Sequence, residues 1–222
     1  MRILSQKSSR QIKRHWKGGQ AQRKMIGTTI SILAILIILP ILACMLIYNK
    51  LVIRRNLLKD AYSQIDVALK RRYDIIPNLL ESLKAYMKKE PEALEAVIRA
   101  RNLASAANTR AAGNPGDPGP MKGLMEAEEV LRTTLTRLFT AVEDSPEINA
   151  DETVRKFMAE INLMENKIAQ ARQAYNAAVQ IYNNSREKFP NLLVANPFGF
   201  KEAFLLDLEL TAAQPDAPLL AF

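Results

Sequence analysis

Residues 25–48 constrain this chain more than any other part of it, because they form an apolar stretch without a charged side chain. Thirteen of them are Leu or Ile, and the nearest charges on either side are Lys24 and Lys50. An α-helix of this length extends about 36 Å, whereas the hydrocarbon core of a bilayer is about 30 Å thick. We therefore predict a transmembrane helix over residues 25–48 that contacts the lipid bilayer.

Two alternatives to a retained transmembrane helix arise from the same stretch. One is a cleaved signal peptide, but the stretch is long for that role and no Ala-x-Ala-like site closes it. The other is lipidation of Cys44, because residues 41–44 resemble a bacterial lipoprotein cleavage box. The apolar run continues through residues 45–47, where a mature lipoprotein turns polar, so we interpret Cys44 as a small apolar helix residue.

The net charge of +8 belongs to the first 24 residues, which contain eight basic and no acidic side chains. The remaining residues hold 23 basic and 23 acidic side chains. Basic residues concentrate on the cytoplasmic side of a membrane segment, so this cluster favours a cytoplasmic N-terminus. A smaller cluster, which weakens the asymmetry, follows the segment at Lys50, Arg54, Arg55 and Lys59. We interpret residues 1–24 as a disordered leader along an anionic membrane surface, and we expect no nucleic-acid partner.

After residue 49, apolar side chains recur at the helical spacings of three, four and seven. This pattern predicts helices over residues 49–88, 91–112, 122–143 and 149–189. Pro77 either bends the first helix or starts a new one, and Asn149 with Glu152 predicts a capping box for the last. Residues 113–120 include six Gly or Pro residues, so we predict a loop there.

Each predicted helix has one apolar face that must be buried against another element. We therefore predict an all-α protein, with a single N-terminal transmembrane helix followed by an antiparallel four-helix bundle of long helices. The predicted parts are a basic tail over residues 1–24, the membrane helix over 25–48, the bundle over 49–200 and a C-terminal tail over 201–222.

The residues that usually carry chemistry are scarce in this chain. Its one His and one Cys both precede residue 49, which excludes multi-His and Cys-rich metal sites. A serine nucleophile in the predicted bundle would have no His beside it to act as a base. We therefore predict no catalytic residue, no metal ligand, no cofactor and no enzyme activity.

Two arginines interrupt the apolar stripes: Arg72 lies between Leu69 and Ile76, and Arg101 lies on the inner face of the second helix. A buried guanidinium destabilises the fold unless it is paired. Either both charges lie at the stripe edge with their heads in water, which we favour, or they belong to a polar network that fixes the helix register. The candidate partners in such a network are Asp66, Asp74 and Glu165.

Several motifs resemble the LemA family. The longest is Ile-Asp-Val-Ala-Leu-Lys-Arg-Arg-Tyr-Asp-Ile-Ile-Pro-Asn-Leu-Leu over residues 65–80, and others lie at 48–49, 51–52, 55–56, 100–104, 165–176, 182–183, 189–190 and 198–200. The resemblance covers residues 45–206. The residues that carry it most clearly are Asp66, Arg71, Arg72, Pro77, Asn78, Arg101, Glu165, Asn166, Arg172, Tyr175 and Asn176.

This resemblance implies a bacterial inner-membrane protein with one span, an antiparallel bundle of long helices, no enzyme activity and no cofactor. The sequence departs from the family pattern in its long basic leader and in the extra residues at its C-terminal end. A long basic leader resembles that of the LemA-like proteins of magnetosome membranes, which would imply a role in magnetosome membrane formation.

Three functions fit these features. The first is a non-enzymatic membrane scaffold, whose partners would be unknown membrane or soluble proteins or further copies of the chain. The second is a factor that shapes membranes, including the magnetosome membrane. The third is an adaptor for a membrane protease, because the chain ends in the apolar residues Leu219, Leu220, Ala221 and Phe222, which peptide-binding modules can capture.

Overall fold

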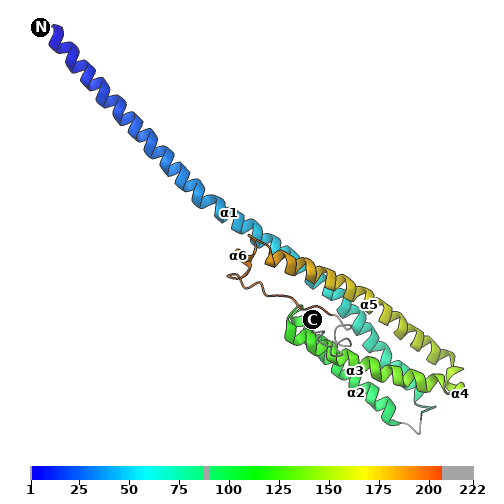
Figure 1. Ribbon diagram of the computed structural model, residues 1–222. Coiled ribbons are helices and arrows are strands. Elements are labelled where there is room, and N and C mark those ends of the chain that lie inside the picture. The colour runs from blue at the N-terminus through cyan, green and yellow to red at the C-terminus, as the bar shows by residue number, and fades with distance from the viewer. Residues whose placement is uncertain (1, 88–90, 207–222) are drawn as a thin grey trace, which may run out of the picture. The chain divides into compact units, whose positions relative to one another are not determined.

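The computed structural model describes the backbone of residues 2–87 and 91–206, and the side chains of residues 32, 33, 35–87 and 91–206. Its helices are α1 (Arg2–Leu83), α2 (Pro91–Gly113), α3 (Pro118–Glu143), α4 (Pro146–Asn149), α5 (Glu152–Glu187) and α6 (Leu192–Ala195) (Figure 1). No strand occurs among the described residues, and the predicted all-α class is confirmed.

The chain divides after Asn49 into two units. In the first unit the apolar stretch is helical throughout, and Leu36, Leu39 and Leu46 expose 69%, 68% and 71% of their surfaces. Of the helices in the described residues, α1 is the one that is long and apolar enough to cross a membrane. Contact of these side chains with water would be unfavourable, because removing apolar surface from water stabilises a protein by about 25 cal/mol per Å². The first unit is therefore compatible with a membrane location.

Residues 2–24 are also helical, so the prediction of a disordered leader is wrong. They contain no proline, and α1 continues into the apolar stretch. A helix extends from an existing helix without the cost of nucleation, which explains why this polar segment is helical.

The second unit begins at Lys50 and is named here the C-terminal unit. In it α2, α3 and α5 lie alongside the later part of α1 (Figure 1). The apolar residues that recur at helical spacings after residue 49 in the first predicted helix are buried, namely Leu58, Tyr62, Ile65, Leu69, Ile76, Leu80 and Leu83 of α1, and Met87 just after its end. The α5 stripe is buried at Ile161, Ile168, Tyr175 and Val179, among others. On α2, Ile98 is 45% exposed and lies outside the core.

The boundaries of several predicted elements are wrong. The helix predicted to reach residue 88 ends at Leu83. The loop predicted over residues 113–120 is shorter, since α2 extends to Gly113 and α3 starts at Pro118. Asp117 caps α3 by accepting a hydrogen bond from the Gly119 amide at 3.2 Å, and Pro118 suits the first helical position, which needs no N–H. Likewise Asp151 caps α5 through the amides of Thr153 and Val154, at 2.8 and 3.2 Å, in place of the predicted Asn149.

The predicted C-terminal tail also starts too early. Residues 201–206 are extended and belong to the packed unit, with Ala203 and Leu206 buried. The prediction failed because this segment has no helical periodicity and is held by side chains of α5. Residues 207–222 lie outside the described part of the chain, and with them the apolar end proposed for a protease adaptor.

Candidate functional site

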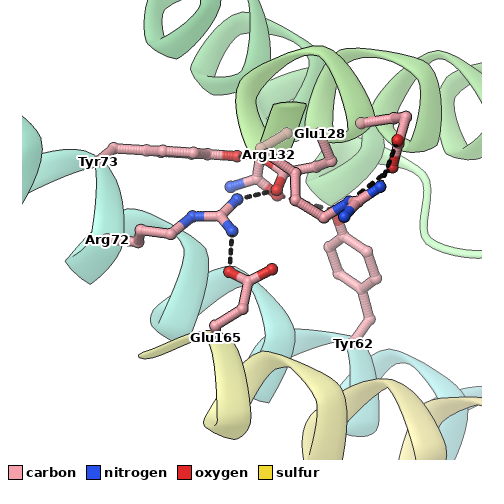
Figure 2. A network of polar contacts seen from close by, with 8 residues as sticks. Tyr62, Arg72, Tyr73, Glu128, Arg132 and Glu165 are labelled. Atoms are coloured by element: carbon pink, nitrogen blue, oxygen red, sulfur yellow. Dashed lines mark hydrogen bonds and ion pairs between the residues drawn. The ribbon is translucent and has the colours of Figure 1, made fainter. Parts of the chain in front are cut away.

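Arg72 is the central residue of a polar network that joins three helices of the C-terminal unit. It extends from α1, is 1% exposed, and donates hydrogen bonds to Glu128 of α3 and Glu165 of α5 (Figure 2). The hydroxyl of Tyr73 donates to the second carboxylate oxygen of Glu128. The Arg72 guanidinium also lies 5.9 Å from the centre of the Tyr73 ring, within the range of a cation–π contact. We call these four residues the Arg72 network.

The residues of the Arg72 network differ in how deeply they are buried. Glu128 exposes 14% of its side chain and Glu165 exposes 37%, so both carboxylates reach toward the surface from a buried arginine. Burial raises the pKa of the Tyr73 hydroxyl above its usual range, which keeps it protonated and able to donate. Since a buried ion pair is costly to break, the network holds α1, α3 and α5 in one register.

The structure decides between the two interpretations of the stripe arginines. For Arg72 the network is confirmed and the favoured position at the stripe edge is wrong. Of the three predicted partners, Glu165 binds Arg72, and Glu128 was missed. The available signal was the position of Glu128 on the apolar stripe of the third helix, between Leu124 and Leu131.

Arg101 has a different role, which involves Pro77. Pro77 lies within α1 and neither ends this helix nor starts a second one. Since proline has no N–H, the carbonyl four residues earlier, that of Tyr73, loses its helical partner. The Arg101 Nε donates to this carbonyl at 3.1 Å, and an Arg101 Nη lies 4.0 Å from Asp74. The side chain of Arg101 thus replaces the missing backbone donor and joins α2 to α1.

Asp66 belongs to a second chain of hydrogen bonds between α1 and α2. The Tyr62 hydroxyl donates to Asn108 Oδ1 at 2.9 Å, and Asn108 Nδ2 donates to Asp66 Oδ1 at 2.7 Å. Lys70 pairs with Asp66 at 2.7 Å, as its spacing of four residues predicts. Burial is the main reason why the pKa of Tyr62 lies above its usual range, and Asp66 adds to the shift.

Two Tyr-Asn pairs on α5, seven residues apart, bind the extended segment 201–206. The Tyr175 hydroxyl donates to the Phe204 carbonyl at 2.8 Å, and that of Tyr182 donates to the Lys201 carbonyl at 2.9 Å. Each asparagine both donates to and accepts from one backbone residue: Asn176 with Leu206 at 3.1 and 2.8 Å, and Asn183 with Ala203 at 2.9 Å in both directions. We call these four residues the Tyr-Asn clamp.

Sequence reasoning singled out Tyr175 and Asn176 as motif residues but did not find their role. The signal was the repeat of the Tyr-Asn dipeptide at positions 175 and 182, because residues seven apart lie on one face of a helix. An asparagine amide matches the donor and acceptor of a peptide group, so a row of such residues can bind an extended chain.

The remaining motif residues lie outside these clusters. Arg71 is exposed and pairs with Glu160 of α5 at 2.8 Å. Asn78 and Asn166 are exposed, and Cys44 is a free cysteine within the apolar stretch. Arg172 lines a cavity of about 30 Å³ together with Arg72, Glu165 and Arg132, and burial lowers the pKa of its guanidinium. A cavity of this size has room for about one water molecule.

The polar side chains at these sites mainly hold helices together. The buried polar groups of the Arg72 network, the Arg101 contact and the Tyr-Asn clamp bond one segment of the chain to another. Among the described residues, no group of three or more His, Cys, Asp or Glu side chains is placed to hold a metal ion.

Comparisons with known proteins identify sequences that are similar to this chain. The LemA family matches residues 61–222. Magnetosome proteins MamQ 1 and MamQ 2 of Paramagnetospirillum magneticum are each 38% identical over 88 residues, which is 40% of this chain and 32% of theirs. Magnetosome protein MamQ of Magnetospirillum gryphiswaldense is 34% identical over 86 residues, which is 39% of this chain and 32% of its own length.

The match to the MamQ proteins thus spans about a third of their length, whereas the match to the family spans most of this chain. The family match includes the residues of the Arg72 network and of the Tyr-Asn clamp. The chain belongs to the LemA family.

Proposed function

We propose that this protein is a non-enzymatic membrane scaffold of the LemA type, which binds partner proteins or further copies of itself. The C-terminal unit then acts as an antiparallel four-helix bundle of α1, α2, α3 and α5. The observation that carries the proposal is that the buried polar residues of the family motif bond helix to helix. Such residues maintain the shape of a binding surface.

Exposed apolar side chains on the C-terminal unit provide contact sites for a partner. Val67 of α1 is 65% exposed and Leu163 of α5 is 51% exposed. The fully buried centre of a protein interface is more apolar than its rim. These two positions are therefore suitable sites for a photo-crosslinking amino acid.

The test is crosslinking in intact membranes from positions 67 and 163, with Asn78 as an exposed polar control position. The scaffold proposal expects the same covalent adducts, to a partner or to a second copy, in repeated experiments from the apolar positions and not from the control. Equal adducts from all three positions, or substrate turnover by the purified full-length chain, would contradict it.

The proposed orientation has the N-terminus in the cytoplasm and the C-terminal unit on the far side of the inner membrane. It follows from the eight basic residues before the apolar stretch. The variant Cys44→Ser with Asn166→Cys carries one exposed thiol on α5. An impermeant maleimide should label it in intact spheroplasts, whereas labelling only after lysis would reverse the orientation.

A second candidate function is a role in forming the magnetosome membrane. The three MamQ relatives are named as magnetosome proteins, and this supports the candidate. The test is expression of this chain in a MamQ-deficient strain of Paramagnetospirillum magneticum. Restored magnetosome vesicles are expected, and their continued absence with the protein present in the membrane would contradict this function.

A further inference from the structure

A groove of about 470 Å³ lies in the C-terminal unit, away from the Arg72 network. Its walls come from four segments: α1 at Arg55, Leu58 and Lys59, the turn between α2 and α3, α5 at Tyr182, and residues 199–203. Sites for small molecules commonly have volumes of about 300–1,000 Å³, so the groove is large enough to hold a ligand.

Three cations line this groove without a partner in the described part of the chain. Arg55, Lys59 and Lys201 are exposed, and none of their side chains forms an ion pair or a hydrogen bond there. The groove is also lined by two carboxylates, those of Asp117 and Glu202. Asp117 caps α3 through the Gly119 amide, and Glu202 lies 3.5 Å from Arg186. The three cations therefore outnumber the two carboxylates by one charge, and Arg186 lies close to one of these carboxylates.

The backbone around these cations is held in place. Gly116 and Gly199 have φ angles of +93° and +70°, which side-chain-bearing residues rarely adopt. The Gly116 carbonyl accepts a hydrogen bond from the Phe204 amide at 3.0 Å, and a Cβ at Gly116 would lie 3.2 Å from Ala203 Cβ. The Tyr-Asn clamp fixes the Lys201 carbonyl through Tyr182. Lys201 thus extends from a fixed backbone, and a ligand would not have to order this wall of the groove.

The chain also limits how far the groove can lie from a bilayer. Arg55 follows Tyr48, the last residue of the apolar stretch, by seven positions. Even a fully extended chain spans at most about 25 Å over seven residues. A basic side chain near a membrane surface that contains anionic lipid is attracted to that surface, whichever side of the membrane it is on.

We propose that this groove binds the phosphate headgroup of an anionic phospholipid, with Arg55, Lys59 and Lys201 as its cationic ligands. This inference concerns a lipid site and does not depend on the scaffold function, because it is tested on the protein alone without a partner.

The test uses the full-length chain in a neutral detergent and measures bound ligand by native mass spectrometry. The ligands are dioctanoyl phosphatidylglycerol, dioctanoyl phosphatidylcholine and inorganic phosphate. The groove variant combines Arg55→Gln, Lys59→Gln and Lys201→Gln. The matched control combines Arg155→Gln, Lys156→Gln and Lys167→Gln, which removes the same charges from exposed positions in the first half of α5.

The proposal expects phosphatidylglycerol to bind the wild type more tightly than either other ligand. Its affinity should fall by at least about tenfold in the groove variant and by less than about twofold in the control. Unchanged affinity in the groove variant, or an equal loss in the control, would overturn the proposal. So would phosphatidylcholine binding as tightly as phosphatidylglycerol. If inorganic phosphate bound as tightly as phosphatidylglycerol, the ligand would be a free anion and not a lipid, and the proposal would be overturned.

Discussion

Arg72 shows how one buried charge can determine the arrangement of several helices. Its side chain is 2% exposed, and its two carboxylate partners come from α3 and α5. A charge in this position loses its hydration, and only a matched pair of acceptors compensates. The residue therefore favours one arrangement of α1, α3 and α5 over others that would bury an equal apolar area.

Replacing Arg72 with Met should destabilise the C-terminal unit by about 3–5 kcal/mol, because Glu128 and Glu165 lose their shared cation. Denaturant unfolding of the full-length chain in detergent, followed by far-ultraviolet circular dichroism, measures this change. A loss below about 1 kcal/mol would show that the network does not hold the helices.

Arg172 provides a matched control on α5. It is partly buried and forms no hydrogen bond or ion pair within the described residues, and its Nε, like that of Arg72, has no hydrogen-bond partner there. Arg172→Met should therefore change the free energy of unfolding by about 1 kcal/mol or less. If both variants lose the same free energy of unfolding, the destabilisation comes from the loss of an arginine side chain and not from the loss of its ion pairs.

At the level of the helices, Pro77 and Arg101 act as a pair that keeps α1 continuous. The carbonyl of Tyr73 lacks a helical donor because of Pro77 and receives one from Arg101. Arg101→Met should destabilise the fold by about 1–3 kcal/mol in the wild type, since it leaves this partly buried carbonyl unpaired.

The same substitution in a Pro77→Ala background should have a smaller effect, because alanine restores a backbone N–H at position 77 that can satisfy the carbonyl. The measurement is a double-mutant cycle of unfolding free energies, with a coupling of about 1 kcal/mol expected. Additive effects of the two substitutions would contradict the assigned role of Arg101.

The Tyr-Asn clamp should control the order of residues 201–206. In the variant Asn176→Ala with Asn183→Ala, the amides of Ala203 and Leu206 lose their acceptors. Their hydrogen exchange should accelerate by at least about tenfold, which mass spectrometry of peptides from this segment can measure. Asn166→Ala, at an exposed position of the same helix, should leave exchange unchanged. Unaltered protection in the double variant would show that other contacts hold the segment.

These elements also show what the sequence could predict. Helical periodicity identified the stripes of α1 and α5, since burial requires apolar residues at repeated spacings. It could not identify Glu128 as a partner of Arg72, because the two are 56 residues apart and their contact depends on how the helices pack. Residues 201–206 were missed because an extended segment bound through its backbone leaves no apolar pattern.

At the scale of the whole molecule, alkaline pH should destabilise the C-terminal unit. Burial raises the pKa of Tyr62, Tyr73 and Tyr175 above the usual value for tyrosine. The folded state then holds protons that the unfolded state releases above about pH 10, so stability is complete below that pH and falls as pH rises further. Thermal melts across this range measure the effect.

The variant Tyr175→Phe should show a smaller alkaline fall, because one of the three titrating groups is removed. It should be less stable than the wild type at neutral pH, since the Phe204 carbonyl loses its donor. An alkaline loss equal to that of the wild type would mean that Tyr175 does not contribute to the pH dependence.

Membrane anchoring of this protein requires that the apolar stretch of α1 resides in lipid, while the C-terminal unit buries its own apolar stripes. Extraction of cell membranes with alkaline carbonate tests this most directly, because it releases peripheral proteins and leaves integral ones behind. We predict that the full-length chain stays in the membrane pellet and is released only by detergent. Recovery of the chain in the carbonate supernatant as a soluble protein would contradict the account.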